Sequence, residues 1–334
     1  MGLVWCILGA AVLLVCAAGW VLSGIVVHPR IHPTRECYAY ELAMGTLTSA
    51  LYEHGWARED FSLTTPYGVR LHGTVVPRAA EAVPADGRER VAVLAHGYTS
   101  CLFGAAKYVP AFHALGFTCV LYDHRNHGDS AKAPTSMGWY EARELAAVCA
   151  YARGRFGENC VLGTHGESMG AATVMLHTAL DDRLAFCVED CGYSSLWQQL
   201  AYNMRHKYHL PVFPFLYLAS GFAALRGGVR FSRVAPVEAV RQASALPMLF
   251  LHGACDSFVP TAMVQELCDA KPGAKRMRIF ADARHAQSCM CHPHEYACEL
   301  ADFLLENGIV DERAAQRARA LPFDGWKTAP NAPQ

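Results

Sequence analysis

One pentapeptide constrains the fold more than any other feature of this sequence. It is GESMG at residues 166–170, which follows a short apolar run at 160–164 and precedes a helical segment at 171–180. A G-x-S-x-G pattern between a strand and a helix is typical of a sharp, strained turn, where larger side chains beside the serine would collide with neighbouring backbone. The sequence therefore predicts a strand–turn–helix unit that exposes Ser168 at a helix N-terminus, which favours developing negative charge.

The rest of the chain alternates short β-rich runs with helical segments. This alternation predicts an α/β fold with a mostly parallel sheet and helices on both of its faces. The expected strands are 61–64, 71–76, 91–95, 118–122, 160–164, 185–189, 248–252 and 277–280, and the expected helices are 36–54, 105–115, 139–155 and 171–180. An aromatic-rich stretch from Tyr193 to Gln242 interrupts the alternation, and we interpret it as a helical cap over an apolar pocket. The alternative is ordinary helical core.

The N-terminus carries no charged side chain from Leu3 to Val27. Such a run is long enough to cross the roughly 30 Å hydrocarbon core of a bilayer as a helix. We expect a single-pass membrane anchor; the alternatives are a cleaved signal peptide, which would have a basic leading region and a shorter apolar stretch, and a buried core helix. Arg30 and Arg35 follow the run and no basic side chain precedes it, which favours a main domain on the cytoplasmic face.

These segments divide the chain into six parts. The predicted parts are an anchor at 1–29, a linker and helix at 30–59, the first part of the core at 60–192, the cap at 193–243, the second part of the core at 244–310 and a C-terminal tail at 311–334. Within the tail, the Pro/Ala/Asn-rich residues from about 324 are expected to be frayed.

The composition indicates a globular protein. Hydrophobic residues make up 52% of the chain and charged residues 18%, which excludes global disorder. The formal net charge is -1, so no electrostatic footprint for nucleic acid is present. The 14 cysteines are scattered, unlike the framework of a disulfide-stapled domain. Those in apolar runs are expected to be buried free thiols, namely Cys119, Cys149, Cys160 and Cys187.

Two further residues follow later strands in an informative order. Asp256 lies just past the run at 248–252, and His285 lies just past the run at 277–280. A serine hydroxyl is a weak nucleophile until a histidine accepts its proton, and a buried carboxylate orients that histidine. The order Ser168, Asp256, His285 therefore predicts a catalytic triad. Asp190, which follows the run at 185–189, is the alternative acid.

An oxyanion formed at Ser168 needs two hydrogen-bond donors. The amide of Met169 follows the nucleophile and supplies one. The loop at 96–100, after the run at 91–95, is expected to supply the other from the amide of Tyr98; the alternative is a plain strand-to-helix turn.

A cluster of Cys and His beside His285 offers a competing metal site. It contains Cys289, Cys291, His292 and His294. Zinc sites usually space two cysteines by two to four residues, whereas a single residue separates Cys289 from Cys291. We therefore expect no metal and interpret the cluster as incidental.

Taken together, these motifs resemble the α/β-hydrolase superfamily. They are HGY at 96–98, DHRNHGDS at 123–130, GESMG at 166–170, the Asp256 loop and His285. More narrowly, the chain resembles membrane-anchored bacterial hydrolases related to the serine aminopeptidase and BEM46-like branches. The resemblance covers about residues 60 to 307. It implies an eight-stranded sheet, a Ser-His-Asp triad and no required cofactor, and its members include esterases, lipases, thioesterases and peptidases.

The expected reaction is acyl transfer to water through an acyl-enzyme. The aromatic cap and the anchor favour a lipophilic ester or thioester, so the expected partners are a small-molecule acyl substrate and the membrane, without nucleic acid. A serine peptidase is the enzymatic alternative. A non-catalytic, membrane-anchored binding protein on the same fold is the alternative of another class.

Overall fold

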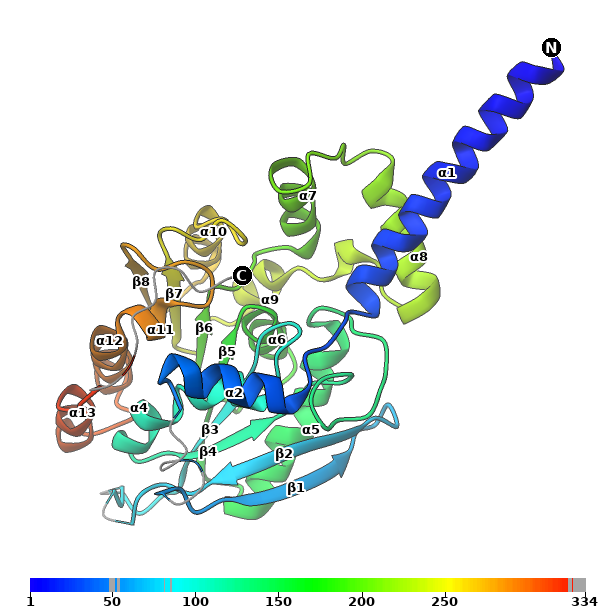
Figure 1. Ribbon diagram of the computed structural model, residues 1–334. Coiled ribbons are helices and arrows are strands. Elements are labelled where there is room, and N and C mark those ends of the chain that lie inside the picture. Colours follow the sequence, from blue (N-terminus) through cyan, green and yellow to red (C-terminus); the bar gives the residue numbers. More distant parts are fainter. Residues whose placement is uncertain (48–51, 53–54, 81, 85, 324–325, 327–334) are drawn as a thin grey trace.

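The computed structural model describes residues 1–47, 52, 55–80, 82–84, 86–323 and 326. Eight strands form one sheet in the order β1-β2-β4-β3-β5-β6-β7-β8 (Figure 1). Only β1 with β2 and β2 with β4 pair antiparallel; the other pairs are parallel. The strands are β1 Glu59–Thr64, β2 Arg70–Val76, β3 Arg90–Ala95, β4 Thr118–Tyr122, β5 Val161–Glu167, β6 Phe186–Asp190, β7 Met248–Gly253 and β8 Lys275–Phe280. The predicted fold class is confirmed.

Helices cover both faces of the sheet because its central strands are apolar on both sides. Every residue of β3, β4, β5, β6 and β7 is buried. One face packs against α2 Thr34–Met44, α3 Leu102–Ala106, α4 Val109–Ala114, α12 Pro293–Glu306 and α13 Glu312–Arg319. The other face packs against α5 Trp139–Phe156, α6 Met169–His177, α9 Pro236–Gln242 and α10 Ala262–Ala270. Burial on both faces is what continuous apolar strands require in a parallel sheet.

Two of the expected helices differ from those observed. The helix expected at 36–54 is α2, which ends at Met44 because Gly45 takes the left-handed conformation with φ 76°; residues 48–51 and 53–54 of that prediction lie outside the described residues. The helix expected at 105–115 is two helices, α3 and α4, because Pro110 starts a new helix in its first turn.

The C-terminal tail expected at 311–334 contains helix α13. Asp311 caps this helix by accepting a hydrogen bond from the amide of Ala314 at 2.8 Å. Ala315 and Ala318 are buried against the core. The frayed end expected from residue 324 lies outside the described residues, apart from Trp326.

The cap contains α7 Leu196–His206, α8 Phe215–Gly227 and a short 3₁₀ turn at Phe231–Arg233. Helix α1, Gly2–Val27, projects away from the sheet, and its second half lies alongside α8 (Figure 1). Gly19 makes this contact possible, since a Cβ there would lie 2.6 Å from the Cβ of Leu218. Val27 joins the apolar cluster of the cap. Helix α1 is long and apolar enough to span a membrane, although a signal sequence or a core helix meets the same criterion.

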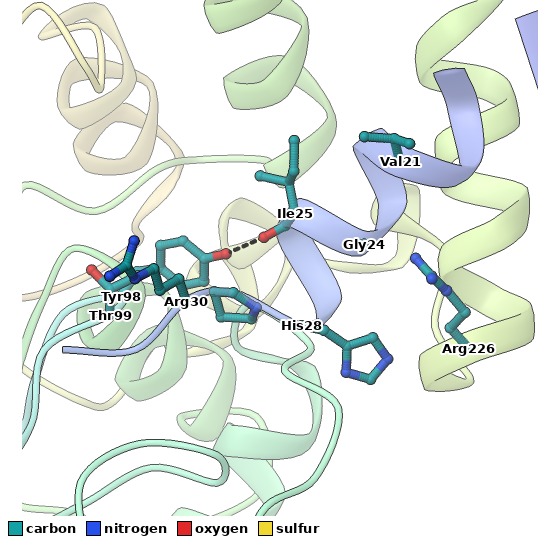
Figure 2. A pocket seen from close by; sticks show the side chains of 9 residues that line it. Val21, Gly24, Ile25, His28, Arg30, Tyr98, Thr99 and Arg226 are labelled. Atoms are coloured by element: carbon teal, nitrogen blue, oxygen red, sulfur yellow. Dashed lines mark hydrogen bonds between the residues drawn. The ribbon is translucent and has the colours of Figure 1, made fainter. Parts of the chain in front are cut away.

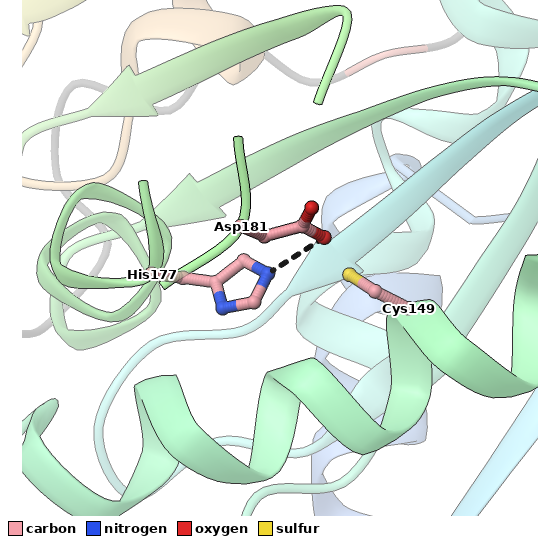
Figure 3. A group of neighbouring side chains, drawn as sticks. All are labelled: Cys149, His177 and Asp181. Atoms are coloured by element: carbon pink, nitrogen blue, oxygen red, sulfur yellow. Dashed lines mark ion pairs between the residues drawn. The ribbon is translucent and has the colours of Figure 1, made fainter. Parts of the chain in front are cut away.

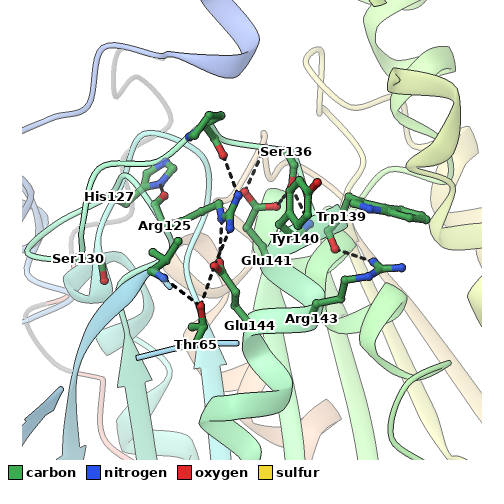
Figure 4. A network of polar contacts seen from close by, with 12 residues as sticks. Thr65, Arg125, His127, Ser130, Ser136, Trp139, Tyr140, Glu141, Arg143 and Glu144 are labelled. Atoms are coloured by element: carbon green, nitrogen blue, oxygen red, sulfur yellow. Dashed lines mark hydrogen bonds and ion pairs between the residues drawn. The ribbon is translucent and has the colours of Figure 1, made fainter. Parts of the chain in front are cut away.

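A buried ion pair joins the loop after β4 to helix α5 (Figure 4). The guanidinium of Arg125 donates from Nε to Glu144 at 2.9 Å and from a terminal nitrogen at 2.7 Å. The two side chains are only 5% and 1% exposed. Arg125 also donates to the carbonyl of Pro134, and Thr65 donates to Glu144, so most of the polar atoms of the pair are satisfied.

Removing one partner of this pair should be costly. We expect Arg125→Met to lower the free energy of unfolding by about 3–5 kcal/mol, because it leaves Glu144 buried without a counter-charge. The double variant Arg125→Met/Glu144→Met should recover much of that loss. Arg241→Met, which breaks the exposed pair with Glu238, is the control and should change stability little. Chemical unfolding followed by circular dichroism gives the measurement; a double variant as unstable as Arg125→Met would contradict the account.

Candidate active site

Ser168 lies at the turn between β5 and α6, as the pentapeptide predicts. Its backbone has a positive φ of 55° with ψ −112°, which lies outside the left-handed helical region and is unusual for a residue other than glycine. A Cβ on Gly166 would lie 2.2 Å from the carbonyl oxygen of Gly170, and a Cβ on Gly170 would lie 2.2 Å from that of Ala95. The two glycines therefore allow the turn to close against the neighbouring strand. The amide of Ser168 donates to the carbonyl of Asp190 at 2.8 Å, which fixes the turn to β6.

The structure brings the three predicted triad residues into one hydrogen-bonded chain. The Oγ of Ser168 lies 2.8 Å from Nε2 of His285. The Nδ1 of His285 lies 2.7 Å from Oδ2 of Asp256. These distances lie within the range in which a histidine can accept the hydroxyl proton while the carboxylate holds its other nitrogen. Three sequence-distant loops, after β5, β7 and β8, supply the three residues at one edge of the sheet.

The loop after β7 holds Asp256 ionised. Its Oδ1 accepts the amides of Phe258 and Val259, both at 2.8 Å. Burial raises the pKa of Asp256, but the neighbouring imidazoles of His285 and His252 more than offset this, and the pKa lies below its ordinary value. A carboxylate that stays ionised can stabilise an imidazolium on His285.

His252 is a residue of the site that the sequence prediction missed. It lies at the end of β7, is fully buried, and places Nε2 3.2 Å from Oδ2 of Asp256 and 3.0 Å from the carbonyl of Val259. It is a positioning residue, since it contacts the acid and not Ser168. In the sequence, His252 is marked only by its position at the end of an apolar strand, four residues before Asp256. A histidine that merely packs in the core can occupy the same position.

Asp190, the alternative acid, has a different role in the structure. It is fully buried, and its Oδ2 accepts the hydroxyl of Tyr108 at 3.2 Å. Burial, followed by the charge of Glu167, raises the pKa of Asp190 to about 6. The carboxylate that contacts His285 is therefore Asp256.

The loop at 96–100 lies against Ser168. A Cβ on Gly97 would lie 3.7 Å from the Cβ of Ser168. Within the described residues, the amides of Tyr98 and Met169 donate no hydrogen bond. The next amide, that of Thr99, donates a hydrogen bond to Nε2 of His127 at 3.1 Å. This bond attaches the loop at 96–100 to the DHRNHGDS segment at 123–130. The amides of Tyr98 and Met169 therefore remain available as hydrogen-bond donors, and their role in binding an oxyanion stays a prediction.

A buried network behind the turn ties Ser168 to the loop of His285. Lys107 pairs with Glu167, with 2.5 Å between Nζ and Oε2, and both side chains are almost fully buried. Lys107 also reaches the carbonyl of Ala286 at 3.5 Å. Burial lowers the pKa of Lys107, but the charges of Glu167 and Glu41 outweigh it, so its pKa lies above the ordinary value. Lys107 thus links Glu167, which precedes Ser168, to Ala286, which follows His285; the sequence prediction missed this contact.

The Cys/His cluster beside His285 is dispersed in the structure. His292 pairs with Asp282, and Nε2 of His294 lies 2.9 Å from the carbonyl of Arg319. Cys289 is buried, whereas Cys291 is only half-buried. These side chains do not point to one common centre.

Cys149, His177 and Asp181 do converge, between helices α5 and α6 (Figure 3). Arg153 already neutralises Asp181, with 2.7 Å between the charged atoms. Burial raises the pKa of the Cys149 thiol above its ordinary value. We therefore interpret this group as structural.

The sequence and the fold of this chain were compared with those of known proteins. No family model matches the chain. The uncharacterized protein YqkD of Bacillus subtilis (strain 168) is 30% identical over 299 residues, which is 89% of this chain and 95% of YqkD. An esterase of Pyrococcus furiosus, Pf2001, superposes with a TM-score of 0.61 at 22% identity, over 77% of this chain and 93% of that one. The chain belongs to the same family as YqkD, and it has the α/β-hydrolase fold.

A second curated relative and a second solved structure are also similar to this chain. The uncharacterized protein YfhR of Escherichia coli (strain K12) is 22% identical over 75% of this chain and 81% of YfhR. Est1E from Butyrivibrio proteoclasticus, solved with ferulic acid bound, has a TM-score of 0.59 at 15% identity, over 74% of this chain and 98% of that one. At these identities the solved structures show a common fold.

The geometry predicts unequal effects at the two buried acids. Asp256→Asn should lower ester turnover by about 10⁴-fold, because the amide favours the wrong tautomer of His285. Asp190→Asn should stay within about tenfold of the parent, because its carboxylate bonds to Tyr108 and not to His285. Steady-state kinetics with a p-nitrophenyl ester gives both values. Greater damage from Asp190→Asn would show that the acid has been misassigned.

Proposed function

We propose that this protein is a serine hydrolase that cleaves an ester or thioester of a lipophilic acyl substrate. The hydrogen-bonded chain from Ser168 through His285 to Asp256 carries the proposal. A protein that only binds ligands on this fold has no need of a strained serine aligned with a histidine and an acid. The Pyrococcus furiosus esterase Pf2001 among the structural neighbours supports the same reaction class.

The reaction proceeds in two steps. Ser168 Oγ attacks the substrate carbonyl while His285 accepts the hydroxyl proton through Nε2, and Asp256 stabilises the imidazolium. The oxyanion is bound by the amides of Tyr98 and Met169. His285 then returns the proton to the leaving alcohol or thiol. Water, activated by His285, hydrolyses the acyl-enzyme and restores Ser168.

The cap supports a lipophilic substrate. The ring of Phe258 lies 4.9 Å from that of His285, so an apolar surface borders the reacting pair. Helix α7 covers this loop, since Gln199 donates to the carbonyl of Phe258. Trp197 and Leu200 on α7 belong to the apolar cluster of the cap.

The proposal also places the protein at a membrane through α1. Helix α1 has 26 residues, and most of its large apolar side chains are exposed. Exposed apolar helices of this length are unfavourable in water and suited to lipid. Arg30 and Arg35 follow the helix and favour a hydrolase domain on the cytoplasmic face.

The nucleophile is tested by a pair of serine variants. Ser168→Ala should lower ester turnover by about 10⁶-fold while the protein remains folded, because only Oγ can form the acyl-enzyme. Ser257→Ala removes an exposed hydroxyl beside Asp256 and should leave turnover near that of the parent. Rates with a p-nitrophenyl ester, together with circular dichroism, distinguish the two. Undiminished turnover in folded Ser168→Ala would contradict the mechanism.

The acyl preference is tested by a series of esters. Each methylene buried beneath the cap contributes about 0.8 kcal/mol, so three or four should raise kcat/KM by about two orders of magnitude. We therefore expect p-nitrophenyl hexanoate and octanoate to exceed the acetate. A higher rate with acetate would show that the cap leaves only a narrow pocket. Faster cleavage of aminoacyl nitroanilides than of any ester would identify a peptidase.

A further inference from the structure

Helices α1 and α8 pack side by side and run in the same direction (Figure 1). Near the start of α8, Leu218 lies against Gly19, where an added Cβ would be 2.6 Å from the Cβ of Leu218. At the end of α8, an added Cβ on Gly227 would lie 3.1 Å from a methyl carbon of Val27. Because the contacts advance along both helices in the same order, each level of α1 has a matching level of α8 beside it.

Polar contacts hold the C-terminal ends of the two helices in place. Arg226, in the last turn of α8, donates to the carbonyl of Trp20 at 3.0 Å and to Oγ of Ser23 at 3.2 Å. The hydroxyl of Tyr98 donates to the carbonyl of Ile25 at 2.7 Å, as the dashed line in Figure 2 marks. These bonds attach α1 to the cap and to the loop after β3. The depth of α1 in a membrane therefore also sets the depth of α8.

The part of α1 that extends beyond α8 is too short to cross a bilayer alone. From Gly2 to Gly19 the helix rises about 26 Å, whereas the hydrocarbon core is roughly 30 Å thick. Even with Gly2 at the far surface of the core, Leu218 beside Gly19 lies about 4 Å inside the near surface. Phe215, where α8 begins, lies about 9 Å inside it, and any tilt of α1 increases both depths. If α1 spans the membrane, the first turns of α8 enter the hydrocarbon.

The composition and exposure of this part of the cap suit hydrocarbon. No charged residue or histidine occurs from Leu210 to Leu225. Phe213 is 73% exposed and Tyr217 is 57% exposed, so both present large apolar surfaces outside the protein core. Contiguous apolar surface of this kind is unfavourable in water and is typical of membrane or protein interfaces. The first charged side chain after this stretch is Arg226, at the end of α8 that lies beyond the hydrocarbon layer.

We propose that the first turns of α8 and the loop before it, residues 210–218, insert into the membrane that α1 spans. Phe213 and Tyr217 then lie among the acyl chains of one leaflet. A second copy of this chain could also cover α8, but the exposed apolar side chains of α1 lie beside the same surface. A bilayer covers both helices at once, which favours lipid as the occupant. The inference extends the proposed function and rests on its placement of α1 in the membrane.

Site-specific photocrosslinking in the full-length protein tests the proposal. The photoreactive residue p-benzoylphenylalanine replaces Phe213 or Tyr217, and the protein is reconstituted in phosphatidylcholine vesicles. Mass spectrometry of the intact protein after irradiation measures the fraction that carries a covalently attached lipid. Two positions in the cap are used so that one poorly folded variant does not decide the result.

Two further positions serve as the controls. Leu13 is exposed on α1 and reports whether that helix lies in lipid. Leu180 is also exposed, but it lies between α6 and β6, at the opposite edge of the sheet from Ser168. We expect the lipid yield at Phe213 and Tyr217 to be near that at Leu13 and at least about tenfold above that at Leu180, because acyl chains surround only the first three positions.

Each other outcome overturns the proposal. Labelling at Leu13 but at neither cap position would show that α8 stays outside the bilayer, and it would leave the placement of α1 standing. An absence of labelling at Leu13 would overturn that placement as well. A crosslink from Tyr217 to a second copy of the chain, seen as a dimer on a denaturing gel, would identify a protein interface. Labelling at Leu180 equal to that at Tyr217 would show no preference for the cap. No turnover is measured, so loss of esterase activity leaves this test intact.

Discussion

The close approach of the turn after β5 to strand β3 determines the geometry of the site. Gly170 lies so near the carbonyl of Ala95 that any side chain there would displace one of the two elements. This close approach accompanies a positive φ at Ser168, the residue directly before α6. In that conformation the hydroxyl of Ser168 reaches Nε2 of His285. Such strain persists only where its surroundings impose it. The buried ion pair of Lys107 with Glu167 supplies part of that restraint. Glu167 directly precedes Ser168, and Lys107 also reaches the carbonyl of Ala286, which directly follows His285.

Helix α1 packs against the rest of the protein, and it is also a candidate membrane anchor. Its second half packs on α8, and its last turn accepts a hydrogen bond from Tyr98. The amide of Tyr98 donates no hydrogen bond within the described residues, and the preceding residue, Gly97, lies against Ser168. Helix α1, the cap and the loop beside Ser168 are therefore joined through a short series of direct contacts.

The sequence predicted those features that local patterns and strand ends determine. Eight apolar runs gave eight strands, and the order of Ser168, Asp256 and His285 placed them at one edge because parallel strands end together. It did not predict His252 or Lys107 as partners of the site, since their roles depend on contacts between loops distant in sequence. Nor did it predict the break between α3 and α4, where Pro110 begins a helix within a continuous apolar pattern. The sequence also did not predict that α1 packs on α8. A helix that spans a membrane and a helix that packs against the cap both need apolar side chains, so the sequence pattern does not distinguish them.

The central claim is that Ser168 is the nucleophile that forms the covalent intermediate. The most direct test treats the detergent-solubilised, full-length protein with a fluorophosphonate and locates the adduct by peptide mass spectrometry. A single adduct per chain, on the peptide that carries Ser168, is the result that the account predicts. It also predicts that heat-unfolded protein takes up no label, because the serine is reactive only beside His285. An adduct on another residue, or a folded protein that takes up no label, would contradict the account.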